Sequence, residues 1–402
     1  MPRGLAALIS AQFFSALADN ALLIVAIALL AAQGHPAWWA PLLKLGFTVA
    51  YVVLAPFVGP LADAFVKARL MMAMNALKVL GVLALLAGVQ PLAAFALVGV
   101  GAAAYAPAKY GLLTELVPPR QLVAANGWIE VTTVCAAIFG TVLGGLLVGP
   151  LAAGWATGGG VLDLAMVMLL GVYALAALLN LAIPDSGARY RRPEVAPRAL
   201  WRGFVRAQIR LWRDAEGGLS MTVTTLFWGV AAVLQFAVLR WAQDRLALTL
   251  DRAAYLQAVV ALGIVAGAAV AGRHVALAQA SRLLPLGIAL GVAVPLVALV
   301  GHWLAALPLL LLIGALGGAL VVPLNALLQH RGHRLLTAGR SIAVQNFNEN
   351  ASVLVMLAVY AGLLALDMDI RAVLALFGAL VATMMTLLWQ RDRLRLRASV
   401  LR

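Results

Sequence analysis

Residues 184–216, PDSGARYRRPEVAPRALWRGFVRAQIRLWRDAE, decide the fold, because they form the only long polar stretch of an apolar chain. The stretch carries eight arginines and separates two apolar blocks of similar length. Its latter part is typical of an amphipathic helix at a membrane interface, since arginines alternate there with Trp201, Phe204, Val205, Ile209 and Trp212. The sequence therefore predicts three parts, at 1–183, 184–216 and 217–402.

The composition on either side of this stretch is that of a membrane protein. Hydrophobic residues make up 64% of the 402 positions and charged residues only 11%, whereas a soluble domain spends about a quarter of its residues on charge. Lipid tails instead require apolar side chains and a backbone whose hydrogen bonds are satisfied internally. The apolar runs are long and lack the period-two alternation of a membrane β-barrel. We therefore expect an all-α membrane protein.

The apolar runs are numerous enough for twelve membrane-spanning helices. Each span needs about 20 apolar residues. The first run is too long for the core of a signal peptide and contains Asp19 and Asn20, so we expect it to remain as a span. The predicted spans are 5–32, 44–62, 70–89, 92–113, 127–149, 160–183, 217–241, 253–271, 283–300, 304–328, 341–366 and 370–389.

The basic residues predict the orientation of these spans. When the loops are assigned alternately to two sides, 22 of the 29 Lys and Arg fall on the side that holds both termini, and five fall on the other. Basic loops stay in the cytoplasm, so both termini and the central linker are predicted to be cytoplasmic. The net charge of +14 then indicates topology and contact with anionic lipids, and no nucleic-acid partner is expected.

The predicted layout has six spans, a cytoplasmic linker and six more spans. It resembles the major facilitator superfamily, whose pseudo-symmetric halves surround a central site. A repeated spacing supports two related halves. Asn126 and Glu130 open the fifth span, and Gln345 and Glu349 open the eleventh, and the carboxylate comes four positions after the amide both times.

The loop GPLADAFVKAR, residues 59–69, resembles the cytoplasmic signature of the same superfamily, although Ala64 and Val66 depart from it. Gly59 permits close approach of two helices, and Asp63 suits the N-terminus of a neighbouring helix. Lys67 and Arg69 would hold the turn to a charge or a phosphate. The resemblance implies that this loop governs conformational switching.

Ionisable groups inside spans are costly and mark functional sites by default. Asp19, with Asn20 beside it and Gln12 two turns earlier, forms a polar point in the first span. Lys109 follows the helix-kinking Pro107 and suits an anionic group such as phosphate. The alternatives are a packing hydrogen bond for Asp19 and an interfacial, snorkelling position for Lys109. Lys78, in the third span, is a slightly weaker candidate.

Glu130, Gln345 and Glu349 are a second set of candidates, suited to an ammonium or hydroxyl head group. They equally suit capping of the cytoplasmic turns, and the sequence favours neither role. No phosphate-binding loop, metal-ligand cluster or Ser/His/Asp set is evident, so we expect neither an enzyme nor a cofactor or metal site.

Four further stretches carry a closer resemblance: AQFFSALADNALL (11–23), VGVGAAAYAPAKYGLLTEL (98–116), VVPLNALLQHRG (321–332) and AVQNFNENA (343–351). They resemble the bacterial lysophospholipid transporter family. The resemblance implies a flippase-like facilitator of the inner membrane that carries lysophosphatidylethanolamine and lysophosphatidylglycerol to the cytoplasmic leaflet. An acyl-ACP synthetase/acyltransferase partner would re-acylate them there.

On this resemblance Asp19, Lys109 and Glu130 match the intramembrane charges of the family. Gln235 stands where relatives are expected to have a basic residue, so a phosphate contact is not carried over to it. The alternative function on the same fold is a proton-coupled exporter of drugs or small solutes, with Asp19 or Glu130 as the proton carrier. A scaffold for the acyltransferase is the remaining hypothesis.

Overall fold

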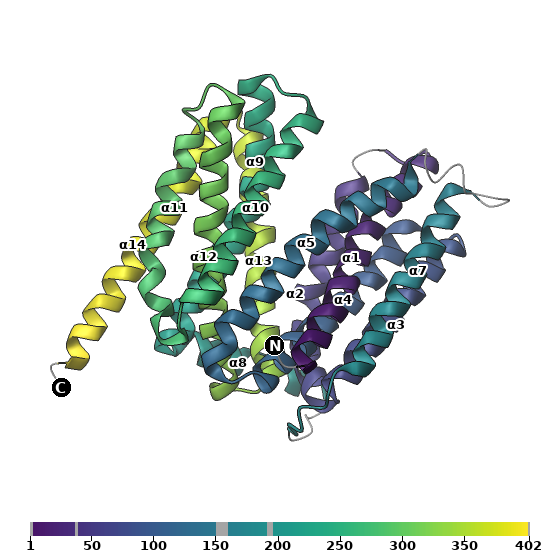
Figure 1. The fold of residues 1–402 in the computed structure, drawn as a ribbon, viewed down its shortest axis with the longest axis horizontal. Coiled ribbons are helices and arrows are strands. Elements are labelled where there is room, and N and C mark those ends of the chain that lie inside the picture. The colour runs from purple at the N-terminus through teal and green to yellow at the C-terminus, as the bar shows by residue number, and fades with distance from the viewer. Residues whose placement is uncertain (1–2, 37–38, 150–159, 191–195, 401–402) are drawn as a thin grey trace. The chain divides into compact units, whose positions relative to one another are not determined.

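The computed structural model describes residues 3–36, 39–149, 160–190 and 196–400, which contain helices and turns and no strand. The helices of the first apolar block are α1 (Arg3–Ala32), α2 (Ala40–Ala64), α3 (Lys67–Leu86), α4 (Pro91–Leu116), α5 (Leu122–Val148) and α7 (Val161–Leu179), with short 3₁₀ turns η2 (Pro119–Gln121) and η3 (Asn180–Ala182). Helix α8 (Pro197–Arg213) occupies the polar stretch (Figure 1). The second block holds α9 (Ala215–Leu246), α10 (Leu250–His274), η4 (Leu277–Leu283), α11 (Leu284–Val297), α12 (Trp303–Leu335), α13 (Ala338–Ala365) and α14 (Ile370–Val400).

Within the described residues, twelve helical segments are long and apolar enough to cross a membrane, which confirms the predicted fold class. Some helices are longer than predicted. Helix α12 continues past 328 to Leu335, and α14 past 389 to Val400. Hydropathy marks only the part of a helix that lies in hydrocarbon, whereas the backbone hydrogen bonds continue where arginine side chains reach the headgroup layer.

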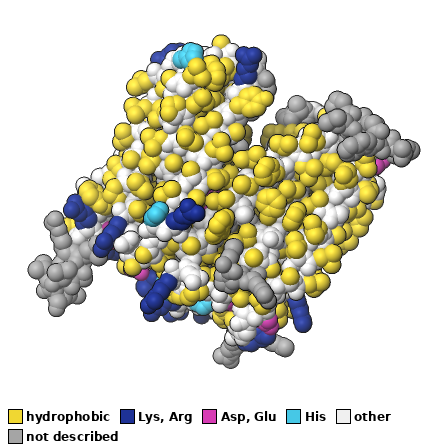
Figure 2. All heavy atoms as spheres, viewed as in Figure 1, with side chains coloured by type: hydrophobic (Ala, Val, Ile, Leu, Met, Phe, Trp, Pro, Cys, Tyr) yellow, Lys and Arg dark blue, Asp and Glu magenta, His cyan; other side chains and the backbone are white. Residues whose placement is uncertain are grey.

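The surface of these helices suits a lipid environment. Large apolar side chains are more than half exposed on several helices, among them Val53, Phe139, Leu178, Val270 and Val355. In Figure 2, apolar side chains cover the sides of the helices, while Lys and Arg side chains gather near their ends. This distribution places hydrocarbon against the sides of the helices and headgroups at their ends.

Contacts divide the chain into two compact units. Unit 1 comprises Met1–Pro118, Thr132–Arg210 and Gly332–Phe347, and unit 2 comprises Pro119–Val131, Leu211–Arg331 and Asn348–Arg402. Unit 1 thus contains the beginning of α13, and unit 2 the beginning of α5. The division into three parts that the polar linker predicts, at 1–183, 184–216 and 217–402, remains a prediction.

The core of unit 1 is apolar and comes from α1, α2, α3, α4, α5 and α7. It includes Leu22, Val82, Phe95 and Met166. Close helix approach supports it at Gly144 of α5, where an added Cβ would lie 2.7 Å from the carbonyl oxygen of Ala21. These contacts position the polar faces of α1, α3 and α4 against one another.

Unit 2 has its own apolar core, formed by α9 to α14 and including Trp241, Leu310 and Phe377. Helices α10 and α12 cross with almost no space between their backbones. An added Cβ on Gly267 would lie 2.0 Å from the carbonyl oxygen of Ala315, and one on Gly318 would lie 2.3 Å from that of Ile264. Small residues four apart on both helices permit this crossing, as in other membrane helix pairs.

Candidate functional site

An ion pair between Asp19 of α1 and Lys78 of α3 lies inside unit 1. Lys78 Nζ is 2.6 Å from Asp19 Oδ2, and the Tyr173 hydroxyl donates a hydrogen bond to Asp19 Oδ1 at 2.7 Å. The Lys78 side chain is 1% exposed and that of Asp19 is 16% exposed. Removing two charges from water costs hydration free energy, and the attraction and hydrogen bond between the two side chains offset that cost.

The Lys78 ammonium has further partners around it. It donates to Ser15 Oγ at 3.0 Å, and Ser15 in turn donates to Asn75 Oδ1 at 2.8 Å. The rings of Tyr105 and Tyr173 have their centroids 5.3 and 5.8 Å from Nζ, within the range of cation–π attraction. An ammonium has three donors, and this pocket of oxygens and ring faces suits all of them.

A second polar cluster surrounds Lys109 of α4. Lys109 Nζ donates to Gln12 Oε1 at 3.2 Å and lies 4.2 Å from the centroid of the Tyr110 ring. The Gln12 amide nitrogen donates to the hydroxyls of Thr132 and Thr133 at 3.1 and 3.2 Å. These contacts tie α1, α4 and α5 together through polar groups.

Both clusters share one face of α1. Gln12, Ser15 and Asp19 are spaced three and four residues apart, which places them in one stripe along the helix. The stripe receives Lys78 from α3 and Lys109 from α4. Asn20 lies outside it, and its side-chain nitrogen donates to the carbonyl oxygen of Ala16 on its own helix at 2.8 Å.

The second set of candidates is also withdrawn from solvent. Glu130 is 7% exposed, Gln345 is 5% exposed and Glu349 is 9% exposed. Glu130 and Glu349 belong to unit 2 and Gln345 to unit 1. Within unit 2, Asn126 donates to Gln329 Oε1 at 2.9 Å. Gln235 of α9 is exposed, and its backbone carbonyl accepts from Gln257 at 2.8 Å.

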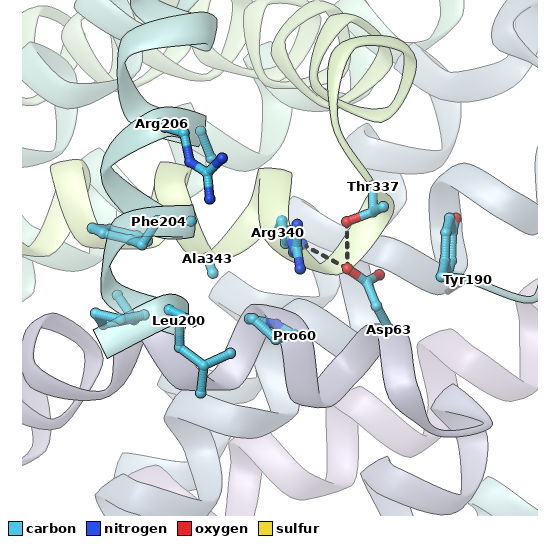
Figure 3. A pocket seen from close by; sticks show the side chains of 14 residues that line it. Pro60, Asp63, Tyr190, Leu200, Phe204, Arg206, Thr337, Arg340 and Ala343 are labelled. Atoms are coloured by element: carbon cyan, nitrogen blue, oxygen red, sulfur yellow. Dashed lines mark hydrogen bonds between the residues drawn. The ribbon is translucent and has the colours of Figure 1, made fainter. Parts of the chain in front are cut away.

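In the 59–69 loop, Asp63 caps the beginning of α13. Its carboxylate accepts hydrogen bonds from the Thr337 hydroxyl and from the Arg340 N–H at 3.3 Å (Figure 3). It also accepts one from the Gly339 N–H at 2.8 Å. A carboxylate at a helix N-terminus accepts hydrogen bonds from backbone N–H groups that have no partner within the helix. Its negative charge also interacts favourably with the positive end of the helix dipole. An added Cβ on Gly59 would lie 2.9 Å from Ala343 Cβ, so glycine permits this approach of α2 and α13. The role of the loop in switching remains a prediction.

The two basic residues of that loop differ. Lys67 forms a buried ion pair with Glu115 at the end of α4, with 2.7 Å between Nζ and Oε1 and both side chains below 5% exposed. Arg69 is exposed. Glu115 also accepts from the Ser186 hydroxyl at 2.6 Å and the Tyr190 hydroxyl at 2.8 Å, so it anchors the start of the linker.

Electrostatics in the linker follow from these contacts. Burial and the nearby Glu115 carboxylate raise the pKa of Tyr190, because both disfavour a phenolate. The hydrogen-bonded Arg189 guanidinium lowers the pKa of the exposed Asp185 to about 2. Both groups therefore keep their usual charge states near neutral pH.

Unit 2 has an ion pair of its own, in which Arg331 of α12 forms a two-pronged contact with Asp214. The two Oδ atoms lie 3.0 and 2.6 Å from Nε and Nη2 of Arg331. Asp214 also accepts from the Gly217 N–H at 2.8 Å and so caps α9. Burial alone would raise the pKa of Asp214, but the Arg331 and Gly217 hydrogen bonds outweigh burial and lower it.

The sequence predicts Asp19 and Lys109 as candidates, and the structure places one in each cluster: Asp19 lies on the polar face of α1, and Lys109 of α4 contacts that face through Gln12. It ranked Lys78 lower, because a long side chain in mid-span can reach the headgroups. The structure instead buries Lys78 against Asp19. Tyr173 and Glu115 were missed. The signal for Glu115 was its place at the end of a span, as one of only 15 acidic residues in the chain.

Comparison with known proteins agrees with this architecture. The family model described as Major Facilitator Superfamily matches residues 8–352. Curated relatives named "Lysophospholipid transporter LplT" include one from Yersinia enterocolitica, 44% identical over 92% of this chain and 90% of its own. Another, from Escherichia coli O1:K1, is 43% identical over 96% of this chain and 95% of its own.

Solved structures share the fold. The human organic anion transporter MFSD10 has a TM-score of 0.73 at 15% identity and covers 96% of this chain and 100% of its own. A bacterial homologue of the iron transporter ferroportin, in its outward-facing state, has a TM-score of 0.72 at 17% identity, covering 97% and 99%. Together with the twelve apolar helices, these matches make the chain a multi-pass membrane protein. The chain belongs to the Major Facilitator Superfamily, in the family of the bacterial relatives named lysophospholipid transporter LplT.

Proposed function

We propose that this protein transports lysophospholipids, chiefly lysophosphatidylethanolamine and lysophosphatidylglycerol, from the outer to the cytoplasmic leaflet of the bacterial inner membrane. An acyl-ACP synthetase/acyltransferase would then re-acylate them. Relatives at 43–44% identity that carry the lysophospholipid name support the substrate class. The basic loops support an inner-membrane orientation with both termini in the cytoplasm.

The observation that carries the proposal is the polar stripe of α1, where Gln12, Ser15 and Asp19 meet two lysines inside an apolar six-helix core. A lysophospholipid has one charged head group and one acyl chain. A compact polar site in an apolar surrounding matches the head group alone, and the acyl chain would remain in lipid through a lateral opening between helices during alternating access.

The contacts suggest different roles for the two lysines. Asp19 holds Lys78 through a short ion pair, and Tyr173 fixes the second Asp19 oxygen, so this pair keeps a charged lysine in place. A head-group phosphate would bind Lys109 by replacing the amide oxygen of Gln12, because a phosphate oxygen is a stronger acceptor than an amide oxygen. Glu130, Gln345 and Glu349 suit an ammonium or hydroxyl group, and we propose them as substrate-binding residues as well.

Uptake by spheroplasts tests the proposal. Cells that lack their own lysophospholipid transporter would express this chain and receive head-group-labelled lysophosphatidylethanolamine. We expect saturable uptake above an empty-vector control and re-acylation of the label when the acyltransferase is present. Uptake at the vector level would refute lysophospholipid transport. Repeating the assay with a protonophore distinguishes the proton-coupled alternative, since obligatory coupling would abolish the flux.

A further inference from the structure

A cavity of about 480 Å³ lies in unit 1 beneath α8, away from the Asp19 and Lys109 clusters. Its walls come from α2, from α8 and from the first turns of α13 (Figure 3). Arg206 of α8 and Arg340 of α13 line it, together with Asp63. In Figure 3, the Arg206 side chain points toward Ala343, and Arg340 lies on α13 at the same cavity.

The polar groups of this cavity leave a positive site. Asp63 already accepts from Thr337, Gly339 and Arg340 through its two oxygens. Among the described residues, no carboxylate forms an ion pair with Arg340 or Arg206. The contact of Arg340 with Asp63 is made by its backbone N–H, and Arg206 Nε donates only to the carbonyl oxygen of Arg202 at 3.4 Å. Two arginines that line one cavity are suited to a phosphate, which accepts several charge-assisted hydrogen bonds at once.

The rest of the lining is apolar, which favours a lipid over a free ion. Pro56 and Ala55 of α2 and Leu200 and Phe204 of α8 contribute carbon surface to the walls. A free phosphate ion would leave this surface without a partner, whereas the glycerol and first acyl carbons of a phospholipid would cover it. Both parts of the lining therefore match one molecule.

The outer face of α8 indicates at which depth of the membrane the cavity lies. Phe204 and Ala207 are buried against the unit, while Trp201, Val205 and Ile209 are 54%, 40% and 46% exposed. A helix with this exposed apolar stripe beside a row of arginines lies at the level of the headgroups and attracts anionic lipids. The cavity under α8 is then at the depth where phosphodiesters are concentrated.

We propose that this cavity binds the phosphodiester of an anionic phospholipid, held between Arg206 of α8 and Arg340 of α13. The bound lipid joins the linker helix to the turn of α13 that Asp63 caps. It thereby stabilises the α2–α8–α13 arrangement of unit 1. This site is distinct from the transport site and goes beyond the proposed transport function.

Binding to the purified full-length protein in detergent tests this proposal, with short-chain dihexanoyl phosphatidylglycerol as the probe. We expect saturable binding that R340Q and R206Q each weaken about tenfold, the loss expected for one charge-assisted contact. R210Q removes the same charge from an exposed position on α8 that does not line the cavity, so it should change the affinity less than twofold. Arg206 is exposed, so R206Q leaves the packing intact even if R340Q disturbs the fold.

Three further arms identify the occupant. Dihexanoylglycerol, which lacks the phosphate, should not compete. Inorganic phosphate should compete only weakly with the lipid probe. If it competed as strongly as the lipid, with the same dependence on Arg206 and Arg340, the site would bind a soluble phosphate and not a phospholipid. Lys109→Gln should leave this binding unchanged, which separates the cavity from the transport site. Equal weakening by R206Q, R340Q and R210Q, or no saturable binding, would overturn the proposal whether or not the chain transports lysophospholipids.

Discussion

Lys78 Nζ lies 2.6 Å from Asp19 Oδ2, although the two residues come from different helices and are 59 positions apart. The pair lies among the apolar side chains of unit 1, where the Lys78 side chain is 1% exposed and that of Asp19 is 16% exposed, so water screens the two charges only weakly. Its consequence is a strong coupling of the two side chains, because removing one leaves the other without compensation.

The coupling of Asp19 and Lys78 leads to a double-variant prediction. Asp19→Asn or Lys78→Met alone should lower the free energy of unfolding by about 3 kcal/mol, the cost of breaking a buried pair. The double variant should be more stable than either single variant. Thermal unfolding of the purified proteins in one detergent measures this. Additive losses would show that the two charges are not coupled.

Lys109→Gln tests the phosphate role of the second cluster. Glutamine retains an N–H that can reach Gln12, but it removes the positive charge. We expect KM for lysophosphatidylethanolamine uptake to rise about tenfold, from the loss of one charge-assisted hydrogen bond. Lys44→Gln makes the same change at an exposed position of α2 and should leave KM within twofold. Equal KM values for wild type and Lys109→Gln would remove Lys109 from the site.

Asp63→Asn tests the switch loop. Asparagine keeps the shape of the cap but weakens the interaction with the α13 N-terminus by about 1 kcal/mol. We expect a several-fold lower maximal uptake rate with KM within twofold, because Asp63 contacts helix ends and not the head-group site. Asp163→Asn, at the exposed N-terminus of α7, is the matched control and should leave both constants unchanged. A change confined to KM would contradict a switching role.

The spans were predictable because each follows from about 20 consecutive apolar residues, a local property of the chain. Asp63 at a helix N-terminus was also expected from its motif, although α13 begins some 275 residues later. Helix ends were less predictable. Arg391 and Arg393 continue α14 beyond its apolar part, and hydropathy does not record a helix that extends into headgroups.

The partners of buried charges could not be read from the sequence, because they depend on how each helix is rotated about its axis. The Lys78 side chain passes close to α4 at Gly101, where an added Cβ would lie 2.9 Å from Lys78 Cγ, and its ammonium meets Asp19 of α1. The same holds for Lys67 and Glu115, which meet at the end of α4. Periodicity places a residue on a face, but packing decides what that face meets.

The close α10–α12 crossing predicts that adding one methyl group at Gly267 lowers the free energy of unfolding considerably. Gly267→Ala would place Cβ 2.0 Å from the Ala315 carbonyl oxygen, which both backbones must move to avoid. We expect a loss of about 2 kcal/mol, typical of overpacking. Gly171→Ala in α7 is the matched control, since an added Cβ there meets nothing within 4 Å. It should stabilise the helix by about 0.5–1 kcal/mol. Similar melting temperatures for the two variants would exclude a tight crossing.

The Asp214–Arg331 pair predicts how stability depends on acidic pH. Hydrogen bonds from Arg331 and Gly217 outweigh burial and hold the pKa of Asp214 below its usual value of 3.8. A lowered folded-state pKa means that the unfolded chain binds its proton first, so the stabilisation is complete above pH 3.8 and is lost as the pH falls through the lowered pKa. Asp214→Asn keeps an acceptor for the Gly217 N–H but leaves Arg331 without this charge. The variant should therefore be less stable than wild type at pH 7, and the two should converge as the pH falls below 3.8. Thermal unfolding midpoints between pH 7 and pH 3 measure the difference, and a gap that stays constant over this range would show that the Asp214 carboxylate is not the stabilising group.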